Sequence, residues 1–312
     1  MKAIDLSWFR SHAARFSGEL RWDEPLSKHT YYQIGGPSAL MATPAGASDL
    51  MWLSDGVRES GIAADHVFFL GKGTNILASD DGFPGLVIKT ARLNTSIRFD
   101  GETSCVHAGV SVGASTLLRE SARNGWSGLS FLTGIPGGMG GVVKMNAGTF
   151  SGETKDQLAS VRGLDLATGE ELRWSGEQLR FSYRENHFLR PSHLVLEIAW
   201  RVTPDDPVKV AAEIGTHLER RKATQPVTMP SCGSVFKNPV EAGMKSWQVI
   251  EKLGLRGLRV GQAQISEMHA NFIVNLGGAR ASEVRQIIET VKSRARAELG
   301  LEMREEVVHL GS

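Results

Sequence analysis

Apolar residues recur at intervals of three and four near the end of the chain, and this spacing predicts an amphipathic helix over residues 282–299. Similar spacing predicts further helices at 48–60, 115–124, 208–222 and 247–253. Short apolar runs bounded by glycine or polar residues predict strands at 66–70, 86–89, 160–166, 170–174, 194–202, 271–275 and 305–310. This mixture of elements predicts an α+β fold.

The chain changes character near residue 204, where the run Thr-Pro-Asp-Asp-Pro (203–207) is typical of a turn or hinge. We take this point as a domain boundary. No internal repeat or low-complexity linker interrupts the 312 residues. That length is enough for about two domains of the usual size.

Composition excludes several classes of protein. Because 35 Lys and Arg balance 34 Asp and Glu, no basic field favours nucleic acid. The longest apolar runs are far shorter than the ~20 residues of a membrane span, and residues 1–20 lack the apolar core of a signal peptide. The two cysteines, Cys105 and Cys232, exclude a disulfide framework and favour a reducing cytoplasm. No Cys/His cluster has metal-binding spacing, so we expect no metal.

Glycine is abundant, with 35 residues, and two glycine-rich runs carry candidate chemistry. Gly71-Lys-Gly-Thr-Asn75 directly follows a predicted strand and matches neither a Walker A loop nor a GxGxxG fingerprint. Its backbone amides can form an anion-binding nest, although a plain tight turn explains the same residues. The longer run from Gly134 to Gly148 contains too many apolar residues for a flexible linker. A backbone packed against a flat or polyanionic ligand, or a set of tight turns, accounts for it.

Polar side chains gather in three other places. The segment Pro230–Pro239 offers Ser234, Lys237 and Asn238, which suit an anionic substrate and a proton donor, although a capped turn is the alternative. No GxSxG elbow surrounds the serine, which disfavours an acyl-transfer nucleophile. Arg184 and Glu306 are each most simply a solvated surface charge, and spacing alone does not join them.

Taken together, these stretches resemble the UDP-N-acetylenolpyruvoylglucosamine reductase (MurB) family. The resemblance is carried, in the family's order, by residues 30–37, 71–77, 132–141, 145–148, 183–184, 233–239, 269–275 and 306–311. It implies an FAD-binding fold of the vanillyl-alcohol-oxidase (PCMH) type with two subdomains, followed by a C-terminal α+β substrate domain. We assign these units to residues 1–92, 93–204 and 205–312.

The resemblance also implies an activity, that of an NADPH-dependent UDP-N-acetylmuramate dehydrogenase in peptidoglycan synthesis. NADPH reduces FAD, and reduced flavin N5 then gives a hydride to C3 of the enolpyruvyl ether of UDP-N-acetylglucosamine. By motif match, Ser234 gives a proton to C2, Arg184 pairs with the substrate carboxylate, and Glu306 is the third catalytic residue. A serine suffices because the carbanionic C2 is a very strong base, and Arg184 acts where charge develops.

The remaining site residues are likewise implied by motif match. Non-covalent FAD is expected to contact Tyr32, Ile34, Gly35, Gly71, Lys72, Gly73, Thr74, Asn75, Gly134, Ile135, Pro136, Gly137, Gly140, Gly141, Asn146, Ala147 and Gly148. The nucleotide-sugar substrate is expected to contact Tyr183, Lys237, Asn238, His269 and Asn271. The protein is expected to be cytoplasmic, without nucleic-acid or membrane partners. The sequence does not determine the oligomeric state, for which a monomer is the default.

Some positions depart from the family pattern, namely His29, Lys144, Asn186 and Cys232. None of them removes a proposed catalytic group. The short interval between Arg184 and Ser234 favours the subtype that lacks an extra substrate loop. Two other hypotheses remain: a flavin oxidase of the same superfamily, which often tethers its flavin covalently, and a flavin- or nucleotide-sugar-binding protein without turnover.

Overall fold

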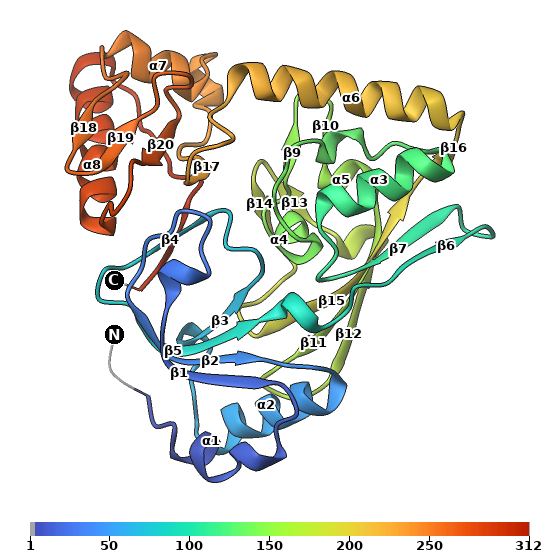
Figure 1. The fold of residues 1–312 in the computed structure, drawn as a ribbon. Coiled ribbons are helices and arrows are strands. Elements are labelled where there is room, and N and C mark those ends of the chain that lie inside the picture. Colours follow the sequence, from blue (N-terminus) through green and yellow to red (C-terminus); the bar gives the residue numbers. More distant parts are fainter. Residues whose placement is uncertain (1–3, 312) are drawn as a thin grey trace.

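The computed structural model describes residues 4–311, and it forms an α+β fold in which three groups of elements meet around one cavity. In Figure 1 the N-terminal group lies at the bottom in blue, the middle group at the right in green and yellow, and the C-terminal group at the upper left in orange and red. No helix in the described range is long and apolar enough to cross a bilayer.

The N-terminal group is a four-stranded sheet in the order β1-β2-β5-β3, packed on a helix. Its elements are β1 (Glu19–Pro25), β2 (Pro37–Thr43), β5 (Phe83–Lys89), β3 (Val67–Leu70) and α2 (Ala47–Glu59). β1 pairs antiparallel with β2, whereas β2 and β3 both run parallel to β5. Leu40, Leu86 and Ile88 of the sheet are fully buried with Leu53 of α2, because the apolar face of the helix covers the strands.

The middle group is an antiparallel five-stranded sheet in the order β12-β11-β15-β7-β6. Its elements are β12 (Glu171–Ser175), β11 (Leu158–Asp165), β15 (His193–Arg201), β7 (Cys105–Gly109), β6 (Ile97–Asp100), α3 (Ala114–Asn124) and α4 (Met139–Lys144). Val106, Ile198 and Trp200 lie fully buried in the core between this sheet and α3 and α4. Leu164 and Leu194 of the same sheet extend into the core of the N-terminal group, so the first two groups share apolar contacts.

A long helix, α6 (Pro207–Thr224), follows the predicted boundary at residue 204. It packs against α3 of the middle group and runs across the top of the molecule toward the C-terminal elements (Figure 1). Asp206 caps its first turn by accepting a hydrogen bond from the Val208 amide. The subdomain boundaries at residues 92 and 204 stay predictions.

The C-terminal group contains the sheet β17-β20-β19-β18 and two helices. Its elements are β17 (Ser231–Ser234), β20 (Phe272–Asn275), β19 (Ala263–Ile265), β18 (Arg259–Val260), α7 (Ser246–Lys252) and α8 (Ala281–Leu299). Val284, Ile287 and Val291 of α8 are fully buried, as their three-and-four spacing predicts. Gly300, at a φ of 65°, ends this helix in the left-handed conformation.

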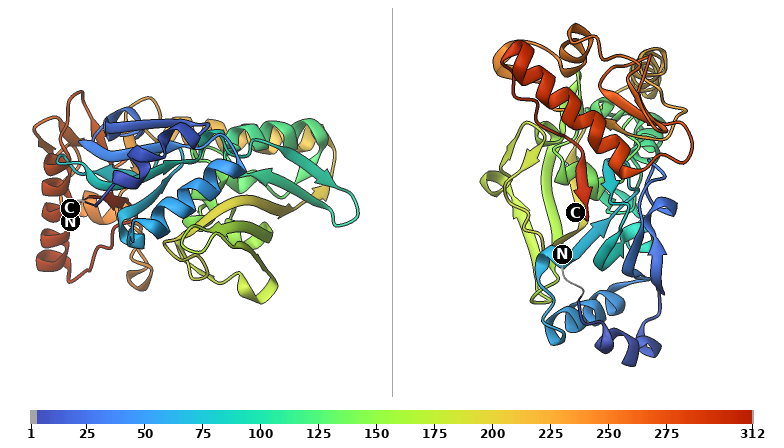
Figure 2. Two further views of the ribbon diagram at one scale, coloured as in Figure 1. Left: turned by 90° about the horizontal axis from the view of Figure 1, so that it is seen from below. Right: turned by 90° about the vertical axis from the view of Figure 1, so that its left-hand side faces the viewer.

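The N-terminal and C-terminal groups interlock. Tyr32 inserts into the C-terminal core, where its hydroxyl donates to the Ile273 carbonyl at 2.8 Å. The C-terminal strand β21 (Val308–Leu310) returns to pair in parallel with β4 (Ile76–Ala78) of the N-terminal group. The Asp80 carboxylate accepts hydrogen bonds from the amides of Ala281 and Ser282, at the start of α8. Figure 2 shows the red terminal strand running back among the blue elements.

The predicted helices are confirmed with shifts of one or two residues at their ends. The sequence patterns predicted no strands at β1, β2, β6 or β7, because polar or small residues interrupt the apolar positions in each of these segments. They also predicted no helix at α4, which lies inside the second glycine-rich run. The last predicted strand was wrong in extent, because residues 305–307 do not belong to the observed strand β21.

Candidate active site

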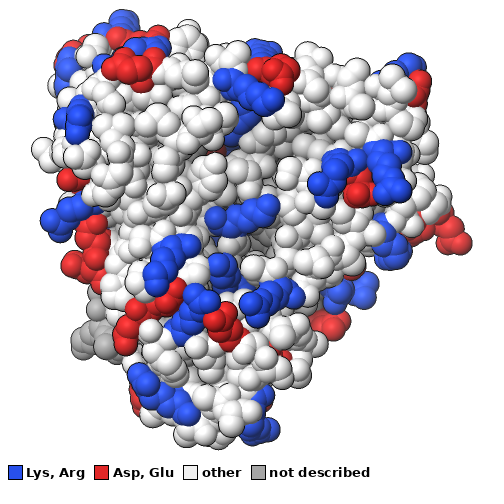
Figure 3. Space-filling model, viewed as in Figure 1, with Lys and Arg blue, Asp and Glu red and all other residues white. Residues whose placement is uncertain are grey.

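A cavity of about 880 Å³ lies where the three groups of elements meet. Its walls are the segment 68–76, the glycine-rich segment 133–149, the C-terminal half of α6, the segment 232–238 and the tail at residue 306. Basic side chains outnumber acidic ones along these walls, with Lys72, Lys144, Arg184, Arg220, Arg221, Lys245 and Arg256 against Glu153 and Glu306. Figure 3 shows lysine and arginine side chains gathered in and around the central hollow. Such a cavity suits large anionic ligands.

The loop Gly71–Asn75 presents backbone to this cavity. Gly73 has a φ of 64°, and a Cβ there would meet the carbonyl oxygen of His29 at 2.3 Å, so only glycine fits. The Gly73 carbonyl accepts the Tyr31 amide at 2.9 Å, which ties the loop to the chain behind it. A Cβ at Gly71 would meet no atom of the described chain within 4 Å, so this backbone faces open space.

The second glycine-rich run lines the same cavity close to that loop, because a Cβ at Gly137 would lie 3.6 Å from Thr74 Oγ1. Gly137 and Gly141 line the wall, and a Cβ at Gly141 would meet no described atom within 4 Å. Gly140 faces the protein instead, where a Cβ would meet Val110 Cγ2 at 2.7 Å. Two neighbouring stretches of exposed backbone, together with the basic lining, fit a flat dinucleotide such as FAD.

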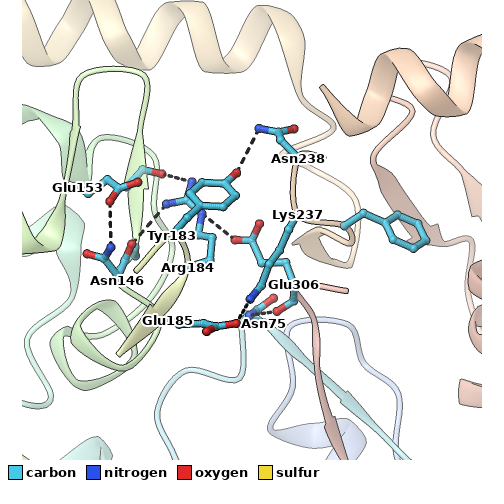
Figure 4. Close-up of polar contacts among 12 residues, drawn as sticks. Asn75, Asn146, Glu153, Tyr183, Arg184, Glu185, Lys237, Asn238 and Glu306 are labelled. Atoms are coloured by element: carbon cyan, nitrogen blue, oxygen red, sulfur yellow. Dashed lines mark hydrogen bonds and ion pairs between the residues drawn. The ribbon is translucent and has the colours of Figure 1, made fainter. Parts of the chain in front are cut away.

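Arg184 lies at the tip of the hairpin formed by β13 (Phe181–Ser182) and β14 (Glu185–Asn186). Its backbone adopts a φ of 59°, which is uncommon for a residue other than glycine. Its Nη1 donates to the Asn146 carbonyl at 3.3 Å and its Nη2 to the Gly148 carbonyl at 2.8 Å. Its Nε lies 3.2 Å from Glu306 Oε1, which makes an ion pair (Figure 4). Two carbonyls and one carboxylate therefore fix the guanidinium.

The tail of the chain holds Glu306 over the cavity. The Glu306 amide donates to the Val235 carbonyl at 2.8 Å, and its carbonyl accepts the Asn75 side-chain amide at 3.0 Å. Burial raises the pKa of the Glu306 carboxyl, and the positive charges of Arg184 and Lys237 partly oppose that rise. The carboxyl therefore binds a proton more readily than an exposed glutamate does.

Ser234 ends β17 and lines the same cavity as Arg184 and Glu306. Its loop is held by Asn271, whose side-chain oxygen accepts the Phe236 amide at 3.0 Å while its side-chain nitrogen donates to the Phe236 carbonyl at 2.9 Å. The Asn271 carbonyl also accepts the Val235 amide. The structure thus brings together the three residues that sequence spacing could not connect.

Residues 183–185 of the hairpin each contact the C-terminal group. The Asn238 side-chain amide donates to the Tyr183 hydroxyl at 3.1 Å, and Lys237 Nζ lies 2.6 Å from Glu185 Oε1 (Figure 4). Asn238 is fixed in turn, because its side-chain oxygen accepts the Ser246 amide. With the pair between Arg184 and Glu306, these contacts form a polar bridge between the middle and C-terminal groups.

Most of the predicted site residues line the cavity. These are Gly71, Lys72, Gly73, Thr74, Asn75, Ile135, Pro136, Gly137, Gly141, Ala147, Gly148, Tyr183, Arg184, Ser234, Asn238, His269, Asn271 and Glu306. Burial lowers the pKa of the His269 imidazole, which favours its neutral form. Its Nδ1 accepts the Asn271 amide at 3.2 Å, so the ring supports the segment that holds Ser234.

The other predicted residues lie off the lining. Tyr32 and Ile34 are buried in the C-terminal core, and a Cβ at Gly35 would meet Ala78 Cβ at 2.5 Å. Asn146 is fully buried, and its side chain donates to Glu153 at 2.9 Å and to the Ser182 carbonyl at 3.0 Å. The remaining members of this set are Gly134, Gly140 and Lys237. Side chains in the core do not support a direct cofactor contact, so these placements favour a structural role for Tyr32, Ile34 and Asn146.

Helix α6 and the turn before β10 (Gly152–Glu153) also contribute to the cavity, and the sequence patterns did not predict this. Arg220, Arg221 and His217 of α6 and Phe150 of that turn all line the cavity. Their local pattern is that of an ordinary solvated helix face and an exposed loop, so no signal in the sequence distinguished them. Cys232 also lines the cavity, and burial raises the pKa of its thiol to about 12, which leaves it a neutral small residue.

Two family models match the chain. The model described as the UDP-N-acetylenolpyruvoylglucosamine reductase C-terminal domain matches residues 225–310, and the model of an FAD binding domain matches residues 53–175. The first match covers the segment that carries Ser234 and Glu306, and the second covers both glycine-rich runs.

Whole-chain comparisons agree with these matches. A UDP-N-acetylenolpyruvoylglucosamine reductase of Geobacter metallireducens is 38% identical over 300 residues, which is 96% of this chain and 96% of the relative. That of Azorhizobium caulinodans is 37% identical over 295 residues, covering 94% and 92%. The crystal structure of the Thermus caldophilus reductase superposes with a TM-score of 0.78 at 33% identity, over 94% of this chain and 99% of that chain.

Proposed function

Because the chain belongs to the UDP-N-acetylenolpyruvoylglucosamine reductase family, we propose that Arg184, Ser234 and Glu306 carry out the proton and charge chemistry of that reaction. The protein is an FAD-dependent oxidoreductase of peptidoglycan precursor synthesis, and NADPH is its hydride donor. It reduces the enolpyruvyl ether of the nucleotide sugar to UDP-N-acetylmuramate. FAD, when bound, supplies the hydride chemistry.

The two backbone walls of the cavity support the binding of that cofactor. We assign the Gly71–Asn75 loop to its diphosphate, because five consecutive residues that include two glycines and Lys72 line the cavity there. We assign Gly137 and Gly141 to close approach of the flat part of the ligand, because side chains at these positions would project into the cavity. No covalent link is required by either assignment.

Arg184 binds the substrate carboxylate and stabilises the negative charge that develops on it. The contacts with the Asn146 and Gly148 carbonyls hold the guanidinium in place before substrate arrives. Each terminal nitrogen keeps a second N–H for the substrate. A charge fixed in advance stabilises a transition state without reorganisation cost. The stabilisation by Arg184 is therefore largest in the transition state, where the enolate forms.

Ser234 donates its hydroxyl proton to C2 of the substrate. The hydroxyl is a weak acid, but the carbanionic carbon is a much stronger base, so transfer is downhill. The loop held by Asn271 places Ser234 on the cavity wall. Glu306 completes the trio by orienting Arg184 through their 3.2 Å ion pair.

The observation that carries this proposal is the meeting of Arg184, Ser234 and Glu306 in one basic cavity with two walls of exposed backbone. The test is to mix the yellow holoenzyme with NADPH and the enolpyruvyl nucleotide and to follow nicotinamide absorbance. We expect oxidation of NADPH that depends on the nucleotide. Flavin-loaded protein that shows no such dependence would contradict the function.

The role of Ser234 is tested by separating the two half-reactions of a Ser234→Ala variant. NADPH should still bleach the flavin at the normal rate, whereas reoxidation by the enolpyruvyl nucleotide should slow by about 10²-fold or more, because the proton donor is absent. Ser293→Ala, on the exposed face of α8, is the matched control and should leave both half-reactions unchanged. Normal reoxidation of the Ser234→Ala flavin would remove Ser234 from the mechanism.

We also propose that the protein acts as a cytoplasmic monomer. Both cysteines are free and buried, as is usual in a reducing compartment. Sedimentation of the holoenzyme tests this, and a stable dimer would contradict it.

A further inference from the structure

Behind the Gly71–Asn75 loop lies a group of charged side chains that the proposed reaction does not use. It joins the end of β1, the turn η2 (Leu26–Lys28) and the end of β5. His29 lies at its centre, with a side chain that is 9% exposed and does not line the cavity. His29 departs from the family pattern, so a role for its imidazole is not part of that pattern.

The two ring nitrogens of His29 have different partners. Lys89 Nζ lies 2.6 Å from Nδ1, and Glu24 Oε1 lies 2.9 Å from Nε2. An ammonium group only donates, so Nδ1 accepts the hydrogen bond from Lys89. The ring proton therefore lies on Nε2 and is donated to the Glu24 carboxylate. These contacts select the neutral ring in one tautomer.

The surroundings of the ring leave little room for a further positive charge. The hydrogen bond from His29 lowers the pKa of the Glu24 carboxyl, and burial lowers the pKa of the Lys89 ammonium. The charged groups that face His29 and Lys89 are Glu19, Arg21 and Glu24 of β1, Lys28 of η2 and Arg92 just after β5. A second ring proton would point an N–H at the Lys89 ammonium, so the contact between His29 and Lys89 would break.

The segment that carries His29 also supports the loop assigned to the FAD diphosphate. The His29 carbonyl packs against Gly73, where a Cβ would collide with it, and the Tyr31 amide donates to the Gly73 carbonyl at 2.9 Å. Lys89 of β5 pairs in register with Leu70, the residue directly before the loop. The His29 side chain therefore ties the segment that packs against the loop to the strands from which the loop emerges.

We propose that His29 is a positioning residue for the Gly71–Asn75 loop, and that a second proton on its ring releases Lys89 and loosens the binding of FAD. The proposal rests on the proposed function, because it takes this loop as the site of the FAD diphosphate. His29 acts through the loop backbone. FAD affinity should therefore fall as pH decreases through the range in which imidazoles titrate, about pH 8 to 5.

The test dilutes the holoenzyme into buffers between about pH 8 and 5 and follows released FAD by its fluorescence. The dissociation constant of the parent should rise about fivefold or more toward acid pH, the lower end of the usual range for coupled equilibria. His29→Gln keeps one donor and one acceptor but cannot titrate, so it should bind FAD like the parent at the alkaline end and lose most of this rise. His29→Ala removes both contacts and should bind FAD weakly at every pH.

Two further variants separate this role from general effects of pH. His193→Gln changes a buried histidine beside Asp165 in the middle sheet, away from the cavity, and should keep the pH dependence of the parent. Lys89→Met removes the partner that the second proton displaces, without altering His29. FAD should therefore bind weakly to Lys89→Met at the alkaline end, and the rise toward acid pH should shrink.

Three results would overturn the proposal. The first is an equal pH dependence of FAD binding in the parent and in both His29→Gln and Lys89→Met. The second is parent-like affinity of His29→Ala at the alkaline end, and the third is a dissociation constant of the parent that stays constant with pH. The proposed function fails separately, when the parent holoenzyme does not oxidise NADPH with the enolpyruvyl nucleotide.

Discussion

At the scale of single residues, the site depends on groups held in unusual states. Arg184 and Asn146 both have positive φ values, 59° and 42°, although neither is glycine. Glu306 is a largely buried carboxyl whose pKa is raised by the loss of solvent around it. Such conformations and buried charges persist only where the surrounding contacts enforce them, and they concentrate at functional sites.

The carboxyl of Glu306 should make stability depend on pH. Because its pKa is higher in the folded chain than the ordinary value of 4.5, the folded state keeps a proton that the unfolded state has released. This contribution to the free energy of unfolding is therefore largest at acidic pH and declines as pH rises from about 4.5 through the folded pKa. Glu306→Gln removes it, so the variant should gain stability relative to the parent over that window.

Urea unfolding of both proteins between pH 4 and pH 8 measures this difference. Glu302→Gln is the control, because the exposed Glu302 pairs with Arg296, which lowers the pKa of the Glu302 carboxyl. The change of stability with pH caused by this substitution should therefore have the opposite sign. A difference between parent and Glu306→Gln that stays constant with pH would contradict the raised pKa.

Asn146 should act on catalysis through Arg184. Its carbonyl accepts from Arg184, and its side chain ties the hairpin at Ser182 to Glu153. Asn146→Gly keeps a backbone that tolerates positive φ and removes only the side-chain ties. We expect kcat/KM for the enolpyruvyl nucleotide to fall about 10-fold to 10²-fold, the range for a slightly misplaced catalytic group.

Two measurements distinguish an effect through Arg184 from a direct cofactor contact: the rate of flavin reduction by NADPH and the flavin content. Both should stay normal in Asn146→Gly. Asn124→Ala, at the exposed end of α3, is the control for loss of an asparagine side chain. Loss of flavin from Asn146→Gly would instead support the direct cofactor contact that the sequence motif implied.

At the scale of elements, short segments connect groups that are far apart in the chain. β21 adds the end of the chain to β4, directly after the Gly71–Asn75 loop. The hairpin β13–β14 reaches the C-terminal group through the polar bridge of residues 183–185. Each segment is only a few residues long, so its position depends on its partner rather than on its own propensity.

A substitution at Leu310 tests whether the terminal strand β21 packs against the N-terminal group. Leu310 is 2% exposed, in a core with Leu26, Phe83 and Val87. Leu310→Ala should lower the free energy of unfolding by about 2–5 kcal/mol, as for other large-to-small core changes. His309→Ala, on the exposed side of the same strand, should change it by less than about 1 kcal/mol. Equal effects in chemical denaturation would mean that β21 does not dock as described.

At the scale of the whole molecule, the cavity exists because three groups of elements share cores and polar contacts. A ligand bound there touches all three, so it should stabilise the molecule by mass action. Adding FAD to apoprotein should therefore raise the melting temperature, by an amount that grows with FAD concentration.

Gly137→Val separates binding from folding. A Cβ at Gly137 would meet no described atom closer than 3.6 Å, so the substitution fits the protein but projects into the cavity. The apoprotein should melt near the parent temperature, and the shift caused by FAD should shrink or vanish. Gly215→Val, at an open position of α6 outside the cavity, is the control and should keep the full FAD shift. A full shift in Gly137→Val would contradict the cofactor assignment.

The sequence by itself determined the long helices, several buried strands, the two glycine-rich runs and the family. The spacing of apolar residues in a helix and the clustering of glycines in a loop involve only residues that are close in sequence. Local sequence patterns therefore predict both. Short edge strands such as β6 were missed because a half-exposed strand has a weak pattern, and α4 was missed because glycine is a poor helix former.

Only the tertiary structure decided which polar residues meet. Arg184, Ser234 and Glu306 come from a hairpin tip, a strand end and the chain terminus, and nothing local couples them. Tyr32 and Asn146 were predicted to contact the cofactor but lie buried away from the cavity wall. Phe150 and Arg220 were not predicted as site residues but line the cavity. The physical reason is that exposure and pairing follow from how the three groups pack, and that packing depends on burial summed over residues far apart in the chain.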